Sequence, residues 1–82
     1  MDVGERIEGF IRDELLFKRS SIALSAETPL TAGLIDSLGM ARLISFLEEE
    51  FDVAIEHADM VPANFRTVRD IERLVLNKLP VG

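Results

Sequence analysis

Apolar side chains recur every three or four residues in three stretches of the chain, which is the spacing that places them on one face of an α-helix. In residues 3–17 that face comprises Val3, Ile7, Phe10, Ile11 and Leu15. After Ser37 it comprises Met40, Leu43, Ile44, Leu47 and Phe51. After Thr67 it comprises Val68, Ile71, Leu74, Val75 and Leu79. We therefore predict three main helices, each with one buried face.

Each of these stretches begins at a residue suited to cap a helix. Asp2, Asp36 and Thr67 carry side-chain oxygens that accept backbone N–H groups of a first turn. Asp70 follows Thr67 at the spacing of a capping box. Pro80 ends the last helix, since proline lacks the N–H that a helix interior needs.

The segments between the helices lack sustained helical spacing. Residues 18–35 contain serine, threonine, proline and glycine, so we predict a long loop. We expect its apolar residues to anchor it to the core: Ile22, Leu24, Leu30 and Leu34. Phe51, Val53 and Ile55 alternate with polar or small residues, but no second strand is available, so we predict an extended connector. Residues 59–64 form one short helical turn, limited by Pro62.

The predicted fold is therefore all-α. It is a small four-helix bundle, with three main helices plus a short third helix, and a long loop joins helices 1 and 2. The 82 residues correspond to a single domain, 1–82.

Composition limits the class of protein. The chain is 48% hydrophobic but has no apolar run of membrane-spanning length, so we expect no membrane insertion. Its first residues carry acids rather than a basic and apolar leader, which argues against a signal peptide. It has no cysteine, which excludes disulfides and thiolate metal sites. We expect a monomer in the cytoplasm.

The net charge of −6 is unevenly placed. Residues 36–60 contain seven acidic residues and one basic residue, Arg42. Such a surface repels phosphates, so nucleic acid is a poor partner. A basic protein surface is a better one.

Ser37 is the residue whose chemistry needs explaining, because it follows the capping Asp36 at the exposed corner of a predicted helix. Catalysis is a weak interpretation. The segment around Ser37 lacks the first glycine of a G-x-S-x-G elbow, and nothing in the sequence brings the single histidine, His57, back to the serine.

A metal site is equally weakly indicated. Glu48, Glu49 and Glu50 are adjacent on a helix and cannot converge on one metal ion. We therefore expect no catalytic residue and no metal site.

The motif Leu34-Ile35-Asp36-Ser37-Leu38, with the helix end Glu48-Glu49-Glu50-Phe51 and the helix start at Thr67, resembles the acyl carrier proteins. The order of elements is similar over nearly the whole chain. In that family the D-S-L motif marks the attachment site of 4′-phosphopantetheine.

The resemblance implies that a phosphopantetheinyl transferase attaches the arm of coenzyme A to Ser37, and that Asp36 helps the transferase to recognise the site. An acyl- or aminoacyl-loading ligase or transferase would charge the thiol, and a downstream synthase or transferase would receive the cargo. The family's partner-facing side of the second helix corresponds to Leu38, Ala41, Arg42, Ser45, Glu48 and Glu49. Its inner side, which can contact a sequestered chain, corresponds to Met40, Leu43, Ile44 and Leu47. For these four residues we favour ordinary core packing.

Two positions depart from the carriers of fatty-acid synthesis. Gly39 and Arg42 stand where those carriers usually have acidic residues. Reversing a charge at an interface changes partner choice. The resemblance therefore favours a specialised or secondary-metabolite pathway over primary fatty-acid synthesis. An unmodified acidic adaptor that only binds proteins remains the alternative.

Overall fold

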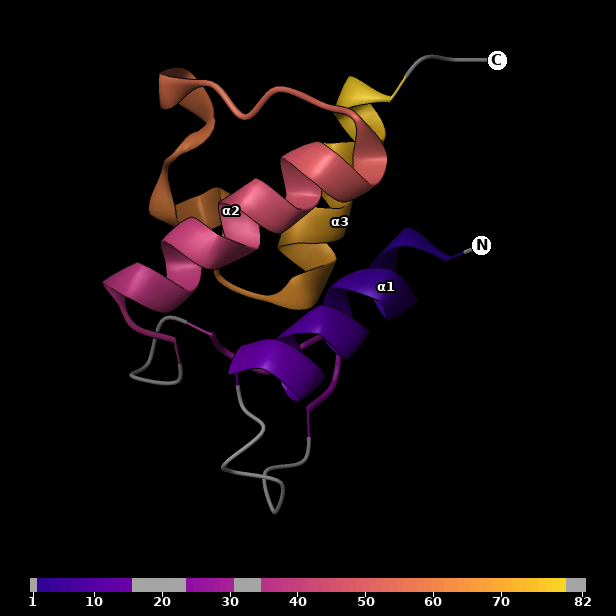
Figure 1. The fold of residues 1–82 in the computed structure, drawn as a ribbon, viewed down its shortest axis with the longest axis vertical. Helices are drawn as coiled ribbons and strands as arrows, with labels where there is room; N and C mark the ends of the chain where they lie inside the picture. Colours follow the sequence, from indigo (N-terminus) through magenta and orange to yellow (C-terminus); the bar gives the residue numbers. More distant parts are fainter. Residues whose placement is uncertain (1, 16–23, 31–34, 80–82) are drawn as a thin grey trace.

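The computed structural model describes residues 2–15, 24–30 and 35–79, and within these ranges it contains helices and turns but no strand. The first helix, α1, spans Val3–Phe10 and continues as a π-helical turn, η1, over Ile11–Leu15. α2 spans Ser37–Phe51 and α3 spans Val68–Lys78. The helices form one bundle, as Figure 1 shows. The predicted all-α class is confirmed.

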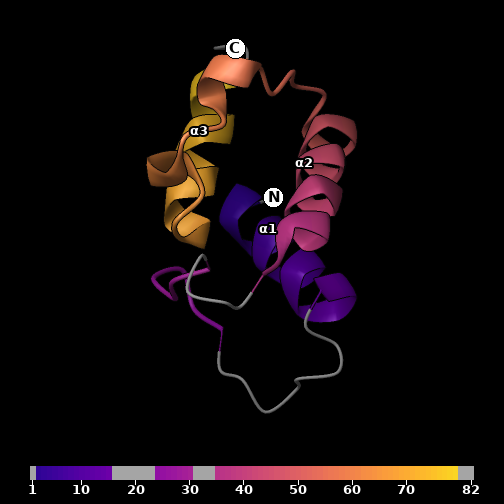
Figure 2. The ribbon, with the colours of Figure 1, turned by 90° about the vertical axis from the view of Figure 1, so that its left-hand side faces the viewer.

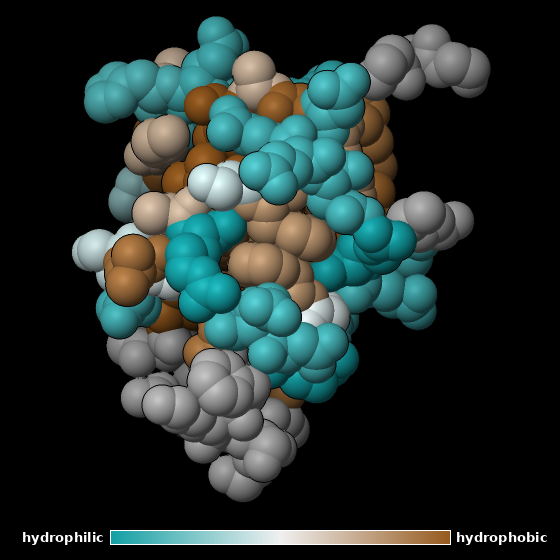
Figure 3. All heavy atoms as spheres, in the orientation of Figure 1, coloured by the Kyte–Doolittle hydropathy of each residue, from teal (hydrophilic) through white to brown (hydrophobic). Residues whose placement is uncertain are grey.

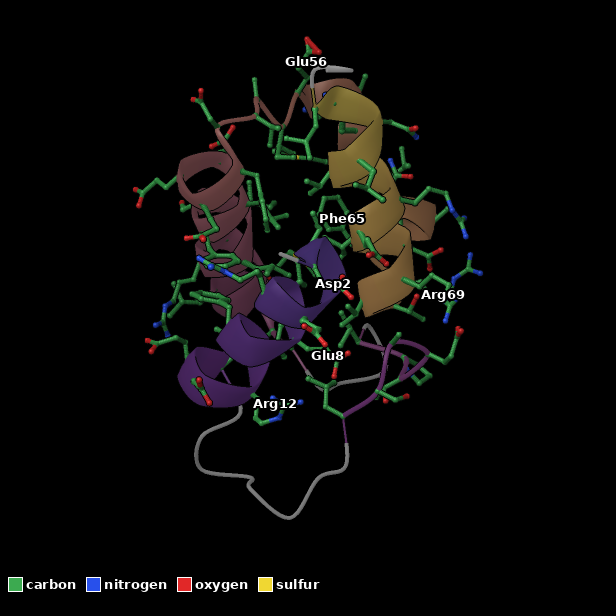
Figure 4. All side chains as sticks on the ribbon, turned by 90° about the vertical axis from the view of Figure 1, so that its right-hand side faces the viewer. Asp2, Glu8, Arg12, Glu56, Phe65 and Arg69 are labelled. Atoms are coloured by element: carbon green, nitrogen blue, oxygen red, sulfur yellow. The ribbon has the colours of Figure 1, made fainter. Side chains whose placement is uncertain are left out.

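α2 and α3 lie on opposite sides of the molecule, and α1 closes the space between them (Figure 2). The buried face of each helix is the predicted one, because the core consists of Ile7, Ile11, Leu30, Leu43, Leu47, Ile55, Phe65, Val68, Ile71, Leu74 and Val75. Phe65 lies three residues before α3, and Figure 4 shows it in the space between α2 and α3. Removing these side chains from water is the main force that holds the bundle together.

The beginning of α1 is fixed to α3 by one backbone N–H group. The Gly4 N–H lies 2.9 Å from an Asp2 carboxylate oxygen and 3.2 Å from a Glu72 carboxylate oxygen on α3. Asp2 therefore caps α1 as predicted. A Cβ atom at Gly4 would lie 3.1 Å from the Glu72 carboxyl carbon, so the missing side chain leaves room for this contact. The last two residues of the predicted 3–17 helix lie outside the described residues.

The second half of the long loop is tied to the start of α3. The Leu30 N–H donates to the Arg66 carbonyl at 2.7 Å, and the Arg69 N–H donates to the Ala26 carbonyl at 3.0 Å. An ion pair between Arg69 and Glu27 lies on the outside of the same contact (Figure 4). Leu30 is fully buried and Leu24 packs against the core, which confirms their predicted anchoring. Ile22 and Leu34 lie outside the described residues.

The segment between α2 and α3 is the part that the sequence predicted least well. Residues 53–56 form an extended connector, as expected. The single turn expected over residues 59–64, however, is wrong. Two separate 3₁₀ turns are present instead, η3 at His57–Asp59 and η4 at Pro62–Asn64.

The reason lies in the caps of the two turns. The Glu56 N–H donates to the Asp59 carboxylate at 2.8 Å, and this capping box fixes the start of the first turn at His57, two residues before the predicted one. Pro62 begins the second turn rather than limiting the first, because its fixed φ and missing N–H suit the start of a helical segment.

The η3 turn is also anchored to the end of α3. Lys78 Nζ lies 2.6 Å from an Asp59 carboxylate oxygen. The hydrogen bond from Lys78, aided by the one from the Glu56 backbone, lowers the pKa of Asp59. No helix within the described ranges is both long and apolar enough to span a membrane.

Truncating Leu47 should destabilise the bundle far more than truncating Leu38 on the same helix. Leu47 is fully buried, whereas Leu38 is 71% exposed. We expect Leu47→Ala to cost about 2–5 kcal/mol of unfolding free energy, and Leu38→Ala to cost less than about 0.5 kcal/mol. Urea unfolding of the two variants measures the difference. Equal losses would mean that α2 is rotated from the orientation described here.

Candidate functional site

The corner where the loop enters α2 is built by the backbone and side chain of Asp36. Its backbone is extended, with φ −86° and ψ −176°. A carboxylate oxygen accepts the Gly39 N–H at 2.7 Å, and its carbonyl accepts the Met40 N–H at 2.9 Å. The predicted N-cap is confirmed. Ser37, the first residue of the helix, is exposed beside this cap.

Gly39 is buried inside the corner, and the sequence alone did not reveal why. A Cβ atom there would lie 3.0 Å from Cγ2 of Ile35 and 3.2 Å from the Asp36 carboxylate oxygen that forms the cap. Any side chain at position 39 would therefore press on the two residues that precede Ser37. The glycine that departs from the pattern of fatty-acid carriers is thus part of the packing of this corner.

Most of the predicted partner face of α2 is open to solvent. Its exposed members are Leu38, Ala41, Arg42, Ser45 and Glu49. Glu48 differs, because it is half-buried and its carboxylate accepts the Ile55 N–H at 2.9 Å. That bond joins the last turns of α2 to the extended connector. Glu48 therefore has a structural role that the sequence did not indicate.

Arg42 leans from this face toward α1. Its guanidinium nitrogens lie 3.4 Å from the Glu14 carbonyl oxygen and 3.5 Å from the Glu14 carboxylate in η1. Two residues that are 28 positions apart in the sequence thus share an exposed contact. A second ion pair between the same two helices joins Arg6 of α1 to Glu50 of α2.

The structure does not bring His57 to Ser37. His57 is exposed in η3, and Figures 1 and 2 show that turn near one end of the molecule while α2 begins toward the other. A serine nucleophile needs a base within hydrogen-bonding distance. In the part of the chain that the structure describes, no group of three or more histidine and acidic side chains could hold a metal ion.

Comparison with known proteins gives the family. Residues 6–75 match the family described as "Phosphopantetheine attachment site". The chain is 32% identical over all of its 82 residues to aminoacyl carrier protein 2 of Bradyrhizobium diazoefficiens, of which it covers 92%. It is 36% identical over 61 residues to aminoacyl carrier protein 1 of the same organism, covering 70% of this chain and 68% of the relative. It is 32% identical over 77 residues to the acyl carrier protein of Lactococcus lactis subsp. cremoris, and the match covers 94% of this chain and 97% of the relative.

The chain belongs to the acyl carrier protein family. Carriers of this family bear a covalently attached phosphopantetheine, and the Asp36–Ser37 corner of this one fits such a group. Ser37 is exposed, so an attached arm needs no cavity. The first N–H groups of a helix have no partner within the helix, and together with the helix dipole they favour a neighbouring phosphate.

Removing the cap of this carrier should weaken α2 in a way that an amide restores. We expect Asp36→Ala to lower the unfolding free energy by about 0.5–2 kcal/mol, because the Gly39 N–H loses its acceptor. Asp36→Asn keeps an acceptor oxygen and should remain near the wild type. Thermal unfolding followed by circular dichroism checks both variants. A loss for Asp36→Asn as large as that for Asp36→Ala would contradict the capping role.

Proposed function

We propose that Ser37 bears the phosphopantetheine arm, and that the carrier holds acyl or aminoacyl groups on it for delivery to biosynthetic enzymes. The observation that carries this proposal is the exposed Ser37 hydroxyl on a helix start fixed by Asp36. When attached, the arm supplies a thiol that holds the cargo as a thioester. The carrier is a cosubstrate, and the chemistry of loading and transfer belongs to its partners.

The two residues of the corner have different roles in this proposal. The Ser37 oxygen forms a bond to a phosphorus of coenzyme A, adenosine 3′,5′-bisphosphate leaves, and the transferase takes the hydroxyl proton. Asp36 positions Ser37, because its bond to Gly39 sets the angle at which the loop meets α2. It also gives the transferase a charged group beside the serine to recognise.

Three observations favour a specialised pathway over primary fatty-acid synthesis. The exposed face of α2 carries the positive Arg42, and a glycine packed against Ile35 and Asp36 stands where carriers of fatty-acid synthesis usually have an acidic residue. In addition, two similar proteins are named aminoacyl carriers. We therefore propose that the partners are a phosphopantetheinyl transferase, an acyl- or aminoacyl-loading ligase or transferase, and a downstream synthase or transferase. They would contact the exposed members of the partner face.

Ser37 should be the residue that becomes modified. Incubation with coenzyme A and a permissive phosphopantetheinyl transferase should add the mass of one phosphopantetheine to the wild type. Ser37→Ala should gain nothing, while Ser45→Ala, which removes an exposed hydroxyl from the same helix, should gain as much as the wild type. Intact mass spectrometry gives the result. A gain by Ser37→Ala, or none by folded and unmodified wild type, would contradict the proposal, and the latter would favour the adaptor function.

The sign of the charge at Arg42 should influence partner choice. Arg42→Glu should speed acyl transfer to a fatty-acid ketosynthase with a basic docking patch severalfold, because opposite charges raise association rates. Arg73→Glu makes the same change in net charge on exposed α3 and should have little effect. Transfer rates at low and high salt measure the effect. Equal rates for wild type and Arg42→Glu would show that Arg42 does not set partner choice.

A further inference from the structure

A shallow groove of about 310 Å³ runs along the outer surface where α1 meets α2. Its floor is aromatic, because Phe10 of α1 and Phe46 of α2 stack with ring centroids 4.2 Å apart and planes 16° apart. Phe51 meets Phe46 edge-on at 6.0 Å and supports it from α2. Figure 3 shows an apolar area on this face of the molecule, bordered by hydrophilic residues. These half-buried rings leave part of their surface open to solvent.

The α1 wall of the groove has a gap with a carboxylate on each side. Glu5, Gly9 and Asp13 follow one another at i, i+4 and i+8, so they lie along one side of the helical segment. A Cβ atom at Gly9 would meet nothing within 4 Å. The missing side chain therefore leaves an open space between two acidic residues that lie about two turns apart.

The charges of the groove are only partly neutralised. Glu14 is paired with Arg42, and Arg6, which also lines the groove, is paired with Glu50. Glu5 and Asp13 have no ion pair with any of the described residues. Among the described residues, the groove thus offers an aromatic floor and two carboxylates without an ion pair, beside an Arg6 whose guanidinium is paired with Glu50.

We propose that this groove is a docking site for a basic segment of a partner protein, which inserts an arginine side chain between Glu5 and Asp13. A guanidinium group is planar, is attracted to the face of an aromatic ring, and pairs with carboxylates through its fixed N–H groups. The net charge of −6 attracts such a segment from a distance. The same negative charge repels nucleic acids, anionic membrane surfaces and a second copy of this chain.

This site is separate from the Ser37 corner. Phe46 follows Ser37 by nine residues, which at about 100° per residue places the two on opposite sides of α2. A protein bound in the groove would leave the Ser37 hydroxyl and its arm free to reach an active site. The groove therefore adds a second contact surface to the one proposed above, and it does not depend on that proposal.

The test is an NMR titration of the ¹⁵N-labelled full chain carrying its phosphopantetheine. The probe is the peptide acetyl-Arg-Gly-Gly-Arg-amide, and its control replaces both arginines by citrulline, which has nearly the same shape but no charge. We expect amide shifts to change around Gly9, Phe10 and Phe46 with the arginine peptide and to remain unchanged with the citrulline peptide. Equal shifts with the two peptides, or shifts centred elsewhere, would overturn the proposal.

Matched variants separate the groove from the general negative charge. Glu5→Gln with Asp13→Asn should weaken the arginine peptide about two- to tenfold, as expected for the loss of two exposed ion pairs. Glu27→Gln with Asp52→Asn changes the net charge equally at exposed residues that do not line the groove, and should leave the affinity near the wild type. Equal weakening by the two pairs would mean that the peptide follows net charge alone.

A change at Gly9 tests the gap directly. Gly9→Gln has room for its Cβ atom and introduces a better helix former, so the variant should be at least as stable as the wild type. It should nevertheless weaken the arginine peptide, because its side chain occupies the gap. Unchanged affinity in this variant would contradict the proposed binding mode.

The groove and the attachment site are tested separately. Ser37→Ala should bind the peptide as the wild type does, so the groove proposal can be wrong while the attachment site is right, and the reverse.

Discussion

The hydrogen bond from the Gly39 N–H to the Asp36 carboxylate, 2.7 Å long, determines where α2 begins. With the start of the helix fixed, its rotation places Leu43 and Leu47 in the core and leaves Ser37 and Leu38 in solvent. Gly39 packs closely against the carboxylate, since a Cβ atom there would lie 3.2 Å from the oxygen that forms the cap. The exposed hydroxyl is thus a consequence of a local cap together with burial of the opposite face of the helix.

The main helices and their buried faces could be predicted because the information is local. Apolar spacing in each stretch determines which side is buried, and Asp2, Asp36 and Thr67 cap the helices in the structure as the sequence indicated. The Thr67 hydroxyl, for example, accepts the Asp70 N–H at 3.2 Å. Interactions between residues close in sequence need no knowledge of the fold.

The contacts that depend on the fold could not be predicted. Among three consecutive glutamates, only the position of the connector decides that Glu48 receives the Ile55 N–H. The contact of Arg42 with Glu14 joins two helices across the long loop. The same holds for the aromatic groove, since Phe10 and Phe46 were predicted to lie on different helices but not to stack. The two turns η3 and η4 also escaped prediction, because the Asp59 carboxylate accepts the Glu56 N–H and so belongs to a turn that begins at His57, before the residues 59–64 expected to be helical.

α2 therefore serves two surfaces of the carrier and the core at once. One side presents the Ser37 corner and the exposed residues that we propose as the partner face, another fills the core, and a third forms the groove with α1. Arg42 lies where the first and third surfaces approach each other, because it contacts Glu14 at the edge of the groove.

A phosphorus–proton correlation NMR spectrum of the modified carrier would test the account's central claim most directly. The account predicts one phosphodiester resonance, coupled both to the pantetheine methylene protons and to the β-protons of Ser37. A phosphodiester coupled to the β-protons of any other serine would contradict it, because the Asp36 cap would then not mark the attachment site.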